Sequence, residues 1–187
     1  MRLSKVGYYA DFLLYPPAVL ALTAAGMWGS RSDYFLCLAS SLLTGIGGWT
    51  LVEYVMHRFV FHRLEAAAEV HEMHHAAPSA YVGTPTWASF VGFALLAFLP
   101  LLWAGGVEFA CGGTAGLMIG YLGYLIVHDA VHRWRIGSTS ILYRAKLRHA
   151  AHHYGDREGN FGVTTDLWDR VFGTSLGVSR GMRNLEA

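Results

Sequence analysis

Long apolar stretches alternate with short polar ones along the first two thirds of the chain. A polar turn at Gly29–Asp33 separates the first two stretches, and a glycine-rich turn at Gly105–Glu108 separates the last two. Since about 20 apolar residues suffice to span a bilayer as a helix, we predict spans at about residues 12–29, 34–56, 87–104 and 107–127. Pro16 and Pro17 are expected to bend or restart the first helix. The pattern predicts an all-α integral membrane protein with four transmembrane helices in two hairpins, forming a single domain over residues 1–187.

Two polar stretches, at residues 57–86 and from residue 128 onward, follow the second and fourth predicted spans. With four spans, these stretches and the N-terminus share one side of the membrane. Of the 14 Lys and Arg residues, all except Arg31 lie on that side. Because basic residues favour the cytoplasmic side, we expect a cytoplasmic, histidine-rich helical cap. The pattern does not distinguish a bacterial inner membrane from the endoplasmic reticulum.

The composition agrees with a membrane protein. Hydrophobic residues make up 53% and charged residues 14%, with a mean hydropathy of +0.33, whereas a soluble domain has about a quarter charged residues. The net charge of +1 and the lack of a dense Lys/Arg run argue against nucleic-acid binding. Cys37 and Cys111 lie in apolar stretches and are expected to be small buried residues. Several glycines in the fourth span, including Gly116 and Gly123, are expected to allow close helix packing.

All ten histidines fall into four groups at or beyond the ends of the predicted spans. Residues at i, i+3 and i+4 share one face of a helix, so each HxxHH box presents its three imidazoles in one direction. An HxxxH pair does the same, whereas two histidines five apart share a metal only where the helix ends or distorts. The groups are His57 with His62; His71, His74 and His75; His128 with His132; and His149, His152 and His153.

Neutral imidazole binds Fe, Zn, Cu and Ni. Any one group alone could be an ordinary surface or core cluster. All four groups together, with no histidine elsewhere, favour two metal ions with about five nitrogens each.

At these residues the chain resembles the fatty acid hydroxylase superfamily, which includes sterol desaturases and carotenoid hydroxylases. The similarity covers residues 50–175 and includes the tail Asn160–Thr174, with its Asn-Phe-Gly, Trp-Asp and Phe-Gly-Thr elements. Glu53-Tyr54 before His57 and Ala76-Ala77-Pro78 after His75 make it most similar to fatty acid 2-hydroxylases. Fungal and animal 2-hydroxylases carry a cytochrome b5 domain, which this sequence does not show. Carotenoid hydroxylases commonly have one more residue in the box matching His128–His132, which favours an acyl substrate.

The resemblance implies a membrane di-iron monooxygenase that uses O2 and external electrons to hydroxylate a lipid acyl chain. The expected position is C2 of a fatty acid or sphingolipid acyl group. Two iron ions are the implied cofactors, although zinc can occupy such sites in purified protein. The implied partners are a lipid substrate from the bilayer and a separate electron donor, either cytochrome b5 or a ferredoxin with its reductase. One metal would be held by His57, His62, His71, His75 and His152, and the other by His74, His128, His132, His149 and His153.

Metal-bound histidines usually need a partner on the second ring nitrogen. Glu53, four residues before His57, and Asp129, beside His128, are the candidates for that role. We expect Glu72, Asp156 and Asp169 to be surface charges instead. Thr165-Asp166 and Gly173 are expected to begin and end a short helix with Trp168 and Phe172 as its buried anchors.

Two other interpretations remain open from the sequence. A carotenoid hydroxylase or a sterol-type desaturase or hydroxylase would use the same scaffold, and substrate trials would separate them. A non-catalytic membrane zinc-binding protein would retain the histidines without oxygen chemistry. A transporter is disfavoured because the middles of the predicted spans lack ionisable residues.

Overall fold

The structure is a computed structural model, and it describes residues 1–28 and 32–177, with no side chains described for residues 32–34. In this part of the chain every regular element is helical, apart from an isolated bridge between Arg2 and Val82. This confirms the expected all-helical class. The helices are α1 Lys5–Met27, α2 Ser32–Val55, η1 Met56–Phe61, α3 Glu65–Ala76, α4 Thr86–Phe93, η2 Ala94–Phe98, α5 Leu99–Arg133, α6 Tyr143–Tyr154 and α7 Leu167–Val171.

The chain divides into two compact units, each formed from two separate segments. Unit 1 consists of Met1–Trp49 and Tyr81–Leu122, and unit 2 consists of Thr50–Ala80 and Gly123–Ala187. All ten histidines belong to unit 2. The single domain expected over residues 1–187 stays a prediction.

Unit 1 contains the long apolar helices. Three helical stretches of the described residues are long and apolar enough to cross a membrane: Lys5–Met27, Phe35–Phe61 and Thr86–Arg133. The last two extend into unit 2. Large apolar side chains on these helices face outward, with Leu96 82% and Trp103 92% exposed. Such exposure is unfavourable in water and is typical of surfaces that contact lipid.

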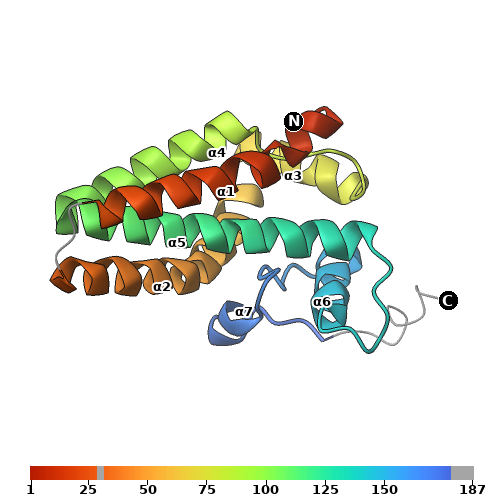
Figure 1. The fold of residues 1–187 in the computed structure, drawn as a ribbon. Helices are drawn as coiled ribbons and strands as arrows, with labels where there is room; N and C mark the ends of the chain where they lie inside the picture. The colour runs from red at the N-terminus through yellow and green to blue at the C-terminus, as the bar shows by residue number, and fades with distance from the viewer. Residues whose placement is uncertain (29–31, 178–187) are drawn as a thin grey trace. The chain divides into compact units, whose positions relative to one another are not determined.

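The third stretch is not one straight helix. At Gly106 the backbone adopts φ 79° and ψ −171°, a conformation that glycine reaches without a steric penalty. The ring centroids of Phe93 and Tyr121 are 5.6 Å apart, although 28 residues of straight helix would separate them by about 42 Å. The chain therefore reverses at Gly106, within the predicted turn, and α4 lies beside the second arm of α5 (Figure 1).

Close contact between α2 and α5 depends on glycine. A Cβ atom on Gly116 would collide with the backbone of Leu42 and Ile46, and one on Gly45 would collide with the backbone of α5. The expected role of the glycines in helix packing is confirmed at Gly116. It is wrong for Gly123, where an added Cβ would meet nothing within 4 Å.

Helix α1 runs without a break through Pro16 and Pro17, so the predicted restart is wrong. The helix is instead tied to the rest of unit 1 by a buried polar contact, in which the Tyr121 hydroxyl donates to Asp11 at 2.6 Å. The ring of Tyr15, which is fully buried, stacks on Phe90 with centroids 4.5 Å apart. These contacts hold α1 against α4 and α5, and the expected bend at the prolines stays a prediction.

Candidate metal centre

The histidines of unit 2 come together in two groups. The five-histidine group comprises His57, His62, His71, His75 and His152, and the four-histidine group comprises His74, His132, His149 and His153. Within each group, one ring nitrogen from every histidine lies within 4.8 Å of all the others. Nine of the ten histidines are thus brought together by helices that are far apart in sequence.

Each HxxHH box contributes to both groups. On α3, His71 and His75 belong to the five-histidine group and His74 to the other. On α6 the arrangement is reversed, since His149 and His153 belong to the four-histidine group and His152 to the five-histidine group. Because i and i+4 lie almost above one another while i+3 is rotated away, one helical box can reach two neighbouring centres. The ring centroids of His75 and His153, which stack between the groups, are 4.1 Å apart.

A π-helical segment brings the rings of His57 and His62 together, although the two residues are five apart in sequence. Residues five apart diverge by about 140° on an ideal α-helix, but η1 is a π-helix over Met56–Phe61. Its i→i+5 hydrogen bonding brings residues five apart onto one face, and the two ring centroids are 5.2 Å apart. The distortion expected between these two histidines is therefore present, as a π-helix at the end of α2.

The spacing of the nitrogens suits a metal ion. In the five-histidine group, Nε2 of His71 lies 3.0 Å from that of His57, 3.1 Å from that of His62 and 3.0 Å from that of His75. Imidazole nitrogens about 2.1 Å from a common ion and at right angles to each other are about 3.0 Å apart. In the four-histidine group, Nε2 of His149 lies 2.8 Å from that of His132 and 3.1 Å from that of His153.

Two rings of the five-histidine group have a defined tautomer. Nδ1–H of His57 donates to the carbonyl oxygen of Phe161 at 2.6 Å, and Nδ1–H of His152 donates to that of Gly159 at 2.9 Å. Nε2 of each neutral ring therefore carries a lone pair. Lone pairs that converge at such distances repel one another unless a cation lies among them, so the residues present fit a metal ion.

Burial keeps the imidazoles neutral. It lowers the pKa of His74 and of His75 to about 4, with the nearby His75 and His62, respectively, adding to the effect. It lowers the pKa of His152 to about 3 and that of His149 well below its usual range. Neutral imidazole is the form that binds metals, and near neutral pH no proton competes for these nitrogens.

His128 lies beside the four-histidine group and is not among its converging nitrogens. The centroid of its ring is 4.7 Å from those of His74 and His132, and the ring stacks on Tyr124. Nε2 of His74 is buried and has no hydrogen-bond partner among the described residues. A buried, unpaired nitrogen is costly, which again suits a bound cation.

The loop of residues 159–164, called the carbonyl loop below, supplies both carbonyl oxygens that orient these rings. The tail motif that begins at Asn160 marks this segment in the sequence. The role of its carbonyls could not be predicted, because a backbone carbonyl is common to every residue type. Asn160 itself holds the loop in shape. It has φ 53°, is fully buried, and its side chain bonds the backbone of Arg148 and Leu176.

Two acidic residues hold the carbonyl loop, and both behave differently from expectation. Glu53 does not pair with a histidine; its buried carboxylate accepts bonds from the backbone of Val163 and Thr164 and from the Thr164 hydroxyl. Asp169, expected to be a surface charge, is fully buried and bonded to the same loop. Both carboxylates therefore support the loop that carries the Phe161 carbonyl oxygen.

The other acidic residues near the histidines lie at the surface or in other contacts, and Glu72 and Asp156 are exposed, as expected. Asp129 forms an ion pair with Arg133 at 2.8 Å, and Glu72 and Asp156 line a pocket of about 380 Å³ beside the five-histidine group. Helix α7 forms as predicted and ends near Gly173, whose φ is 69°. Phe172 is 51% exposed, so the prediction that it is a buried anchor is wrong.

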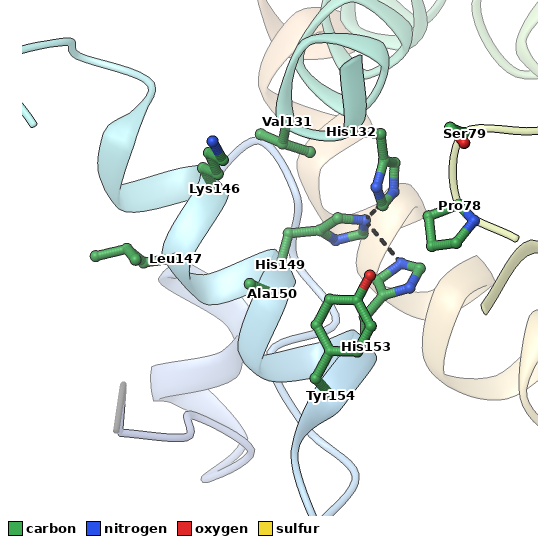
Figure 2. A pocket seen from close by; sticks show the side chains of 10 residues that line it. All are labelled: Pro78, Ser79, Val131, His132, Lys146, Leu147, His149, Ala150, His153 and Tyr154. Atoms are coloured by element: carbon green, nitrogen blue, oxygen red, sulfur yellow. Dashed lines mark hydrogen bonds between the residues drawn. The ribbon is translucent and has the colours of Figure 1, made fainter. Parts of the chain in front are cut away.

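A larger pocket of about 630 Å³ opens beside the four-histidine group. Figure 2 shows His132, His149 and His153 pointing toward one another at its wall. Its other lining residues are mostly apolar and come from the chain after α3, from α5 and from α6: Pro78, Ser79, Val131, Lys146, Leu147, Ala150 and Tyr154. The volume lies within the range of small-molecule sites.

A helical fold with two partly buried polyhistidine groups and long apolar helices is typical of membrane-associated metalloproteins. The fatty acid hydroxylase family matches residues 42–174, more than half of the chain. The chain belongs to the fatty acid hydroxylase family, as its motifs predicted.

The curated relatives that the chain matches are named as fatty acid hydroxylases. The chain is 36% identical over 204 residues to "Fatty acid 2-hydroxylase" of Mus musculus, covering 92% of this chain and 54% of that protein. It is 34% identical over 193 residues to "Ceramide very long chain fatty acid hydroxylase SCS7" of Saccharomyces cerevisiae, covering 94% of this chain and 47% of that protein. The chain thus spans about half the length of the curated relatives it matches.

A solved structure is also similar. The chain superposes on "Full length scs7p (only hydroxylase domain visible)" with a TM-score of 0.79 and 25% identity, covering 92% of this chain and 68% of that one. The helical arrangement described above is therefore one that occurs in a hydroxylase domain of the same family.

Proposed function

We propose that this protein is a membrane-embedded, O2-dependent di-iron monooxygenase that hydroxylates a lipid acyl chain at C2. The observation that carries the proposal is the convergence of nine histidine nitrogens into two groups in a member of the fatty acid hydroxylase family. The acyl group belongs to a free fatty acid or to a sphingolipid. The names of the relatives, fatty acid 2-hydroxylase and ceramide fatty acid hydroxylase, support this substrate class.

The proposed ligands are the ten histidines in the division that the resemblance to the family implies. His57, His62, His71, His75 and His152 hold one iron; His74, His132, His149 and His153, accompanied by His128, hold the other. An all-imidazole donor set suits iron, and it also suits zinc, which would explain zinc in purified protein. When bound, the two ions would supply the redox chemistry by which O2 and two electrons oxidise a C–H bond.

In the overall reaction, one oxygen atom enters the C–H bond and the other leaves as water, with two electrons and two protons consumed. The electrons come from a separate donor, either a cytochrome b5 or a ferredoxin with its reductase. The protein holds the histidines neutral and largely shielded from water. Exclusion of water from the reacting groups limits side reactions.

The pocket beside the four-histidine group is the proposed site for the acyl chain. Val131, Leu147 and Ala150 give it apolar walls, and His132, His149 and His153 form the end where oxidation takes place. An acyl chain gains about 0.8 kcal/mol per buried CH2. This burial energy would hold the acyl chain in the pocket while its C2 atom lies beside the histidines.

We further propose that four helices cross the membrane in two hairpins and that the histidine-rich region faces the cytoplasm. The reversal at Gly106 supports two crossings within Thr86–Arg133. The distribution of basic residues supports the orientation, although Arg31, the single basic residue expected on the opposite side, lies outside the described residues. The sites would then lie where a lipid can enter from the bilayer.

The test is expression in an iron-supplied host whose lipids lack 2-hydroxy acyl groups, together with an electron donor. We expect close to two irons per chain, and 2-hydroxy fatty acids that carry one labelled oxygen when 18O2 is supplied. His152→Ala, in the five-histidine group, should abolish product and lower the metal content. Folded protein with two irons, reduced by its donor, that yields no 2-hydroxy product from fatty acid or sphingolipid would refute the proposal.

A further inference from the structure

The two histidine groups differ in how firmly their rings are held. In the five-histidine group, His57 and His152 each donate Nδ1–H to a carbonyl of the carbonyl loop. In the four-histidine group, Nδ1 of His149 and Nδ1 of His153 are buried without a hydrogen-bond partner among the described residues. One group therefore has two rings fixed in tautomer and direction, while the other lacks this support at two of its four rings.

Asp169 aims the carbonyl that orients His57. Its Oδ2 accepts a bond from the Gly162 N–H at 2.8 Å, and its Oδ1 accepts one from the Phe161 N–H at 2.9 Å. The Gly162 N–H and the Phe161 carbonyl belong to one planar trans peptide, so they point in opposite directions. When Asp169 binds one end of this peptide, the other end must face His57.

The surroundings of Asp169 fix it in place. Its side chain is fully buried, and Oδ1 also accepts from the Thr174 hydroxyl at 2.7 Å. Bonds to an ionised acceptor are roughly twice as strong as neutral ones. An ionised acceptor also polarises the Phe161–Gly162 peptide that donates to it, which strengthens the hydrogen bond that the Phe161 carbonyl accepts from His57.

Glu53 holds the other end of the carbonyl loop. Its carboxylate accepts the Thr164 N–H at 2.9 Å and the Thr164 hydroxyl at 2.7 Å, in addition to the Val163 N–H. Two buried carboxylates thus bind six loop and tail donors between them. They confine the peptide group whose carbonyl orients His57. The peptide whose carbonyl orients His152 is held separately, because its Asn160 N–H donates to the carbonyl oxygen of Thr174 at 3.0 Å.

We propose that the two histidine groups bind metal with unequal affinity, that the five-histidine group fills first, and that Asp169 is a positioning residue for that group alone. The proposal rests on the proposed function only in taking the two histidine groups as metal sites. Ring orientation by a hydrogen-bonded partner is worth 10–100-fold in metal affinity. A ring that is already oriented loses no freedom when it binds, so the difference between the groups should fall in this range.

The experiment is a metal titration of the purified full chain in detergent micelles after chelation, using Co²⁺. Calorimetry gives the affinities, and the visible spectrum of Co²⁺ reports ligand geometry. The wild-type chain should bind two ions in two phases that differ at least about tenfold in affinity. His152→Ala should remove the tight phase, and His153→Ala should remove the weak one.

Asp169→Asn should weaken the tight phase about 10–100-fold and change its Co²⁺ spectrum, leaving the weak phase unchanged. Asp166→Asn is the matched control, because Asp166 lies three residues away and pairs at the surface with Arg170. It should alter neither phase. A role of Asp169 in stability alone would weaken both phases together and would overturn the assignment.

Two equal phases in the wild-type chain, or loss of the weak phase in His152→Ala, would overturn the order of filling. These histidine variants keep the proposal testable if Asp169→Asn does not fold. The results of the metal titration can be distinguished from a failure of the proposed function. Unequal binding without lipid hydroxylation would leave the metal inference standing, hydroxylation with equal phases would remove it alone, and folded protein that binds no metal would remove both.

Discussion

Asn160 offers a sharp test of the carbonyl loop, because its backbone and its side chain contribute separately. Its φ of 53° lies in the left-handed region, and its buried Oδ1 accepts from the Leu176 N–H at 2.8 Å. Asn160→Gly and Asn160→Ala both remove the side-chain bonds. They differ in that glycine tolerates this φ and alanine does not.

The magnitudes follow from these contacts. Loss of the bond from the part-buried Leu176 N–H costs about 0.5–1.5 kcal/mol in either variant. Alanine adds about 1–2 kcal/mol for the left-handed backbone, while glycine adds about 0.5–1 kcal/mol through its freer unfolded state. The glycine variant should therefore be the more stable of the two, by about 0.5–1 kcal/mol or roughly 1–4 °C in Tm.

The assay is thermal unfolding in detergent micelles, followed by intrinsic fluorescence, for the wild type and both variants. The control is Ala21→Gly at an exposed position inside α1, where the usual helical order applies and glycine should be about 1 kcal/mol less stable than alanine. The sign of the glycine–alanine difference should thus reverse between the two positions. An alanine variant at position 160 as stable as the glycine variant would refute the left-handed loop geometry.

Two further predictions concern the pocket and the helix packing. Ala150→Trp should fill the larger pocket and reduce acyl hydroxylation at least tenfold with metal content unchanged. Ala68→Trp, beside the smaller pocket, should not reduce hydroxylation. Product analysis measures the hydroxylation and elemental analysis the metal content, and equal losses of hydroxylation in the two variants would argue against the pocket assignment. Gly116→Ala should lower the stability by about 1–3 kcal/mol through overpacking against α2, whereas Gly123→Ala should leave it unchanged or raise it; thermal unfolding in micelles decides, and a stable Gly116→Ala would contradict the close helix contact.

Local patterns made much of the site predictable. An HxxHH box brings its imidazoles to one side of a helix wherever that helix lies, so the gathering of histidines followed from spacing. The division between two groups depends on more. It requires His74 and His152 to point away from their box partners, toward residues on α5 and beside η1, and only the packed helices decide that.

The acidic residues show where sequence reasoning failed. Glu53 was expected to face His57 because it lies four residues earlier on the same helix. In the structure the backbone donors of Val163 and Thr164 bind it instead. Asp169 resembled any surface charge beside an exposed helix. Its burial results from the turn at residues 159–164, which brings unpaired N–H groups to it.

The sequence by itself determined the helical class, the long apolar segments and the concentration of imidazoles beside them, since hydrophobicity and short-range spacing act within a single helix. The tertiary structure alone decided which nitrogens share a centre, which rings are fixed and which carboxylates are buried. These features depend on contacts between residues about 100 positions apart, such as His57 with Phe161 and Glu53 with Thr164. They also depend on backbone carbonyl and N–H groups, which are the same in almost every residue and leave no mark in the sequence.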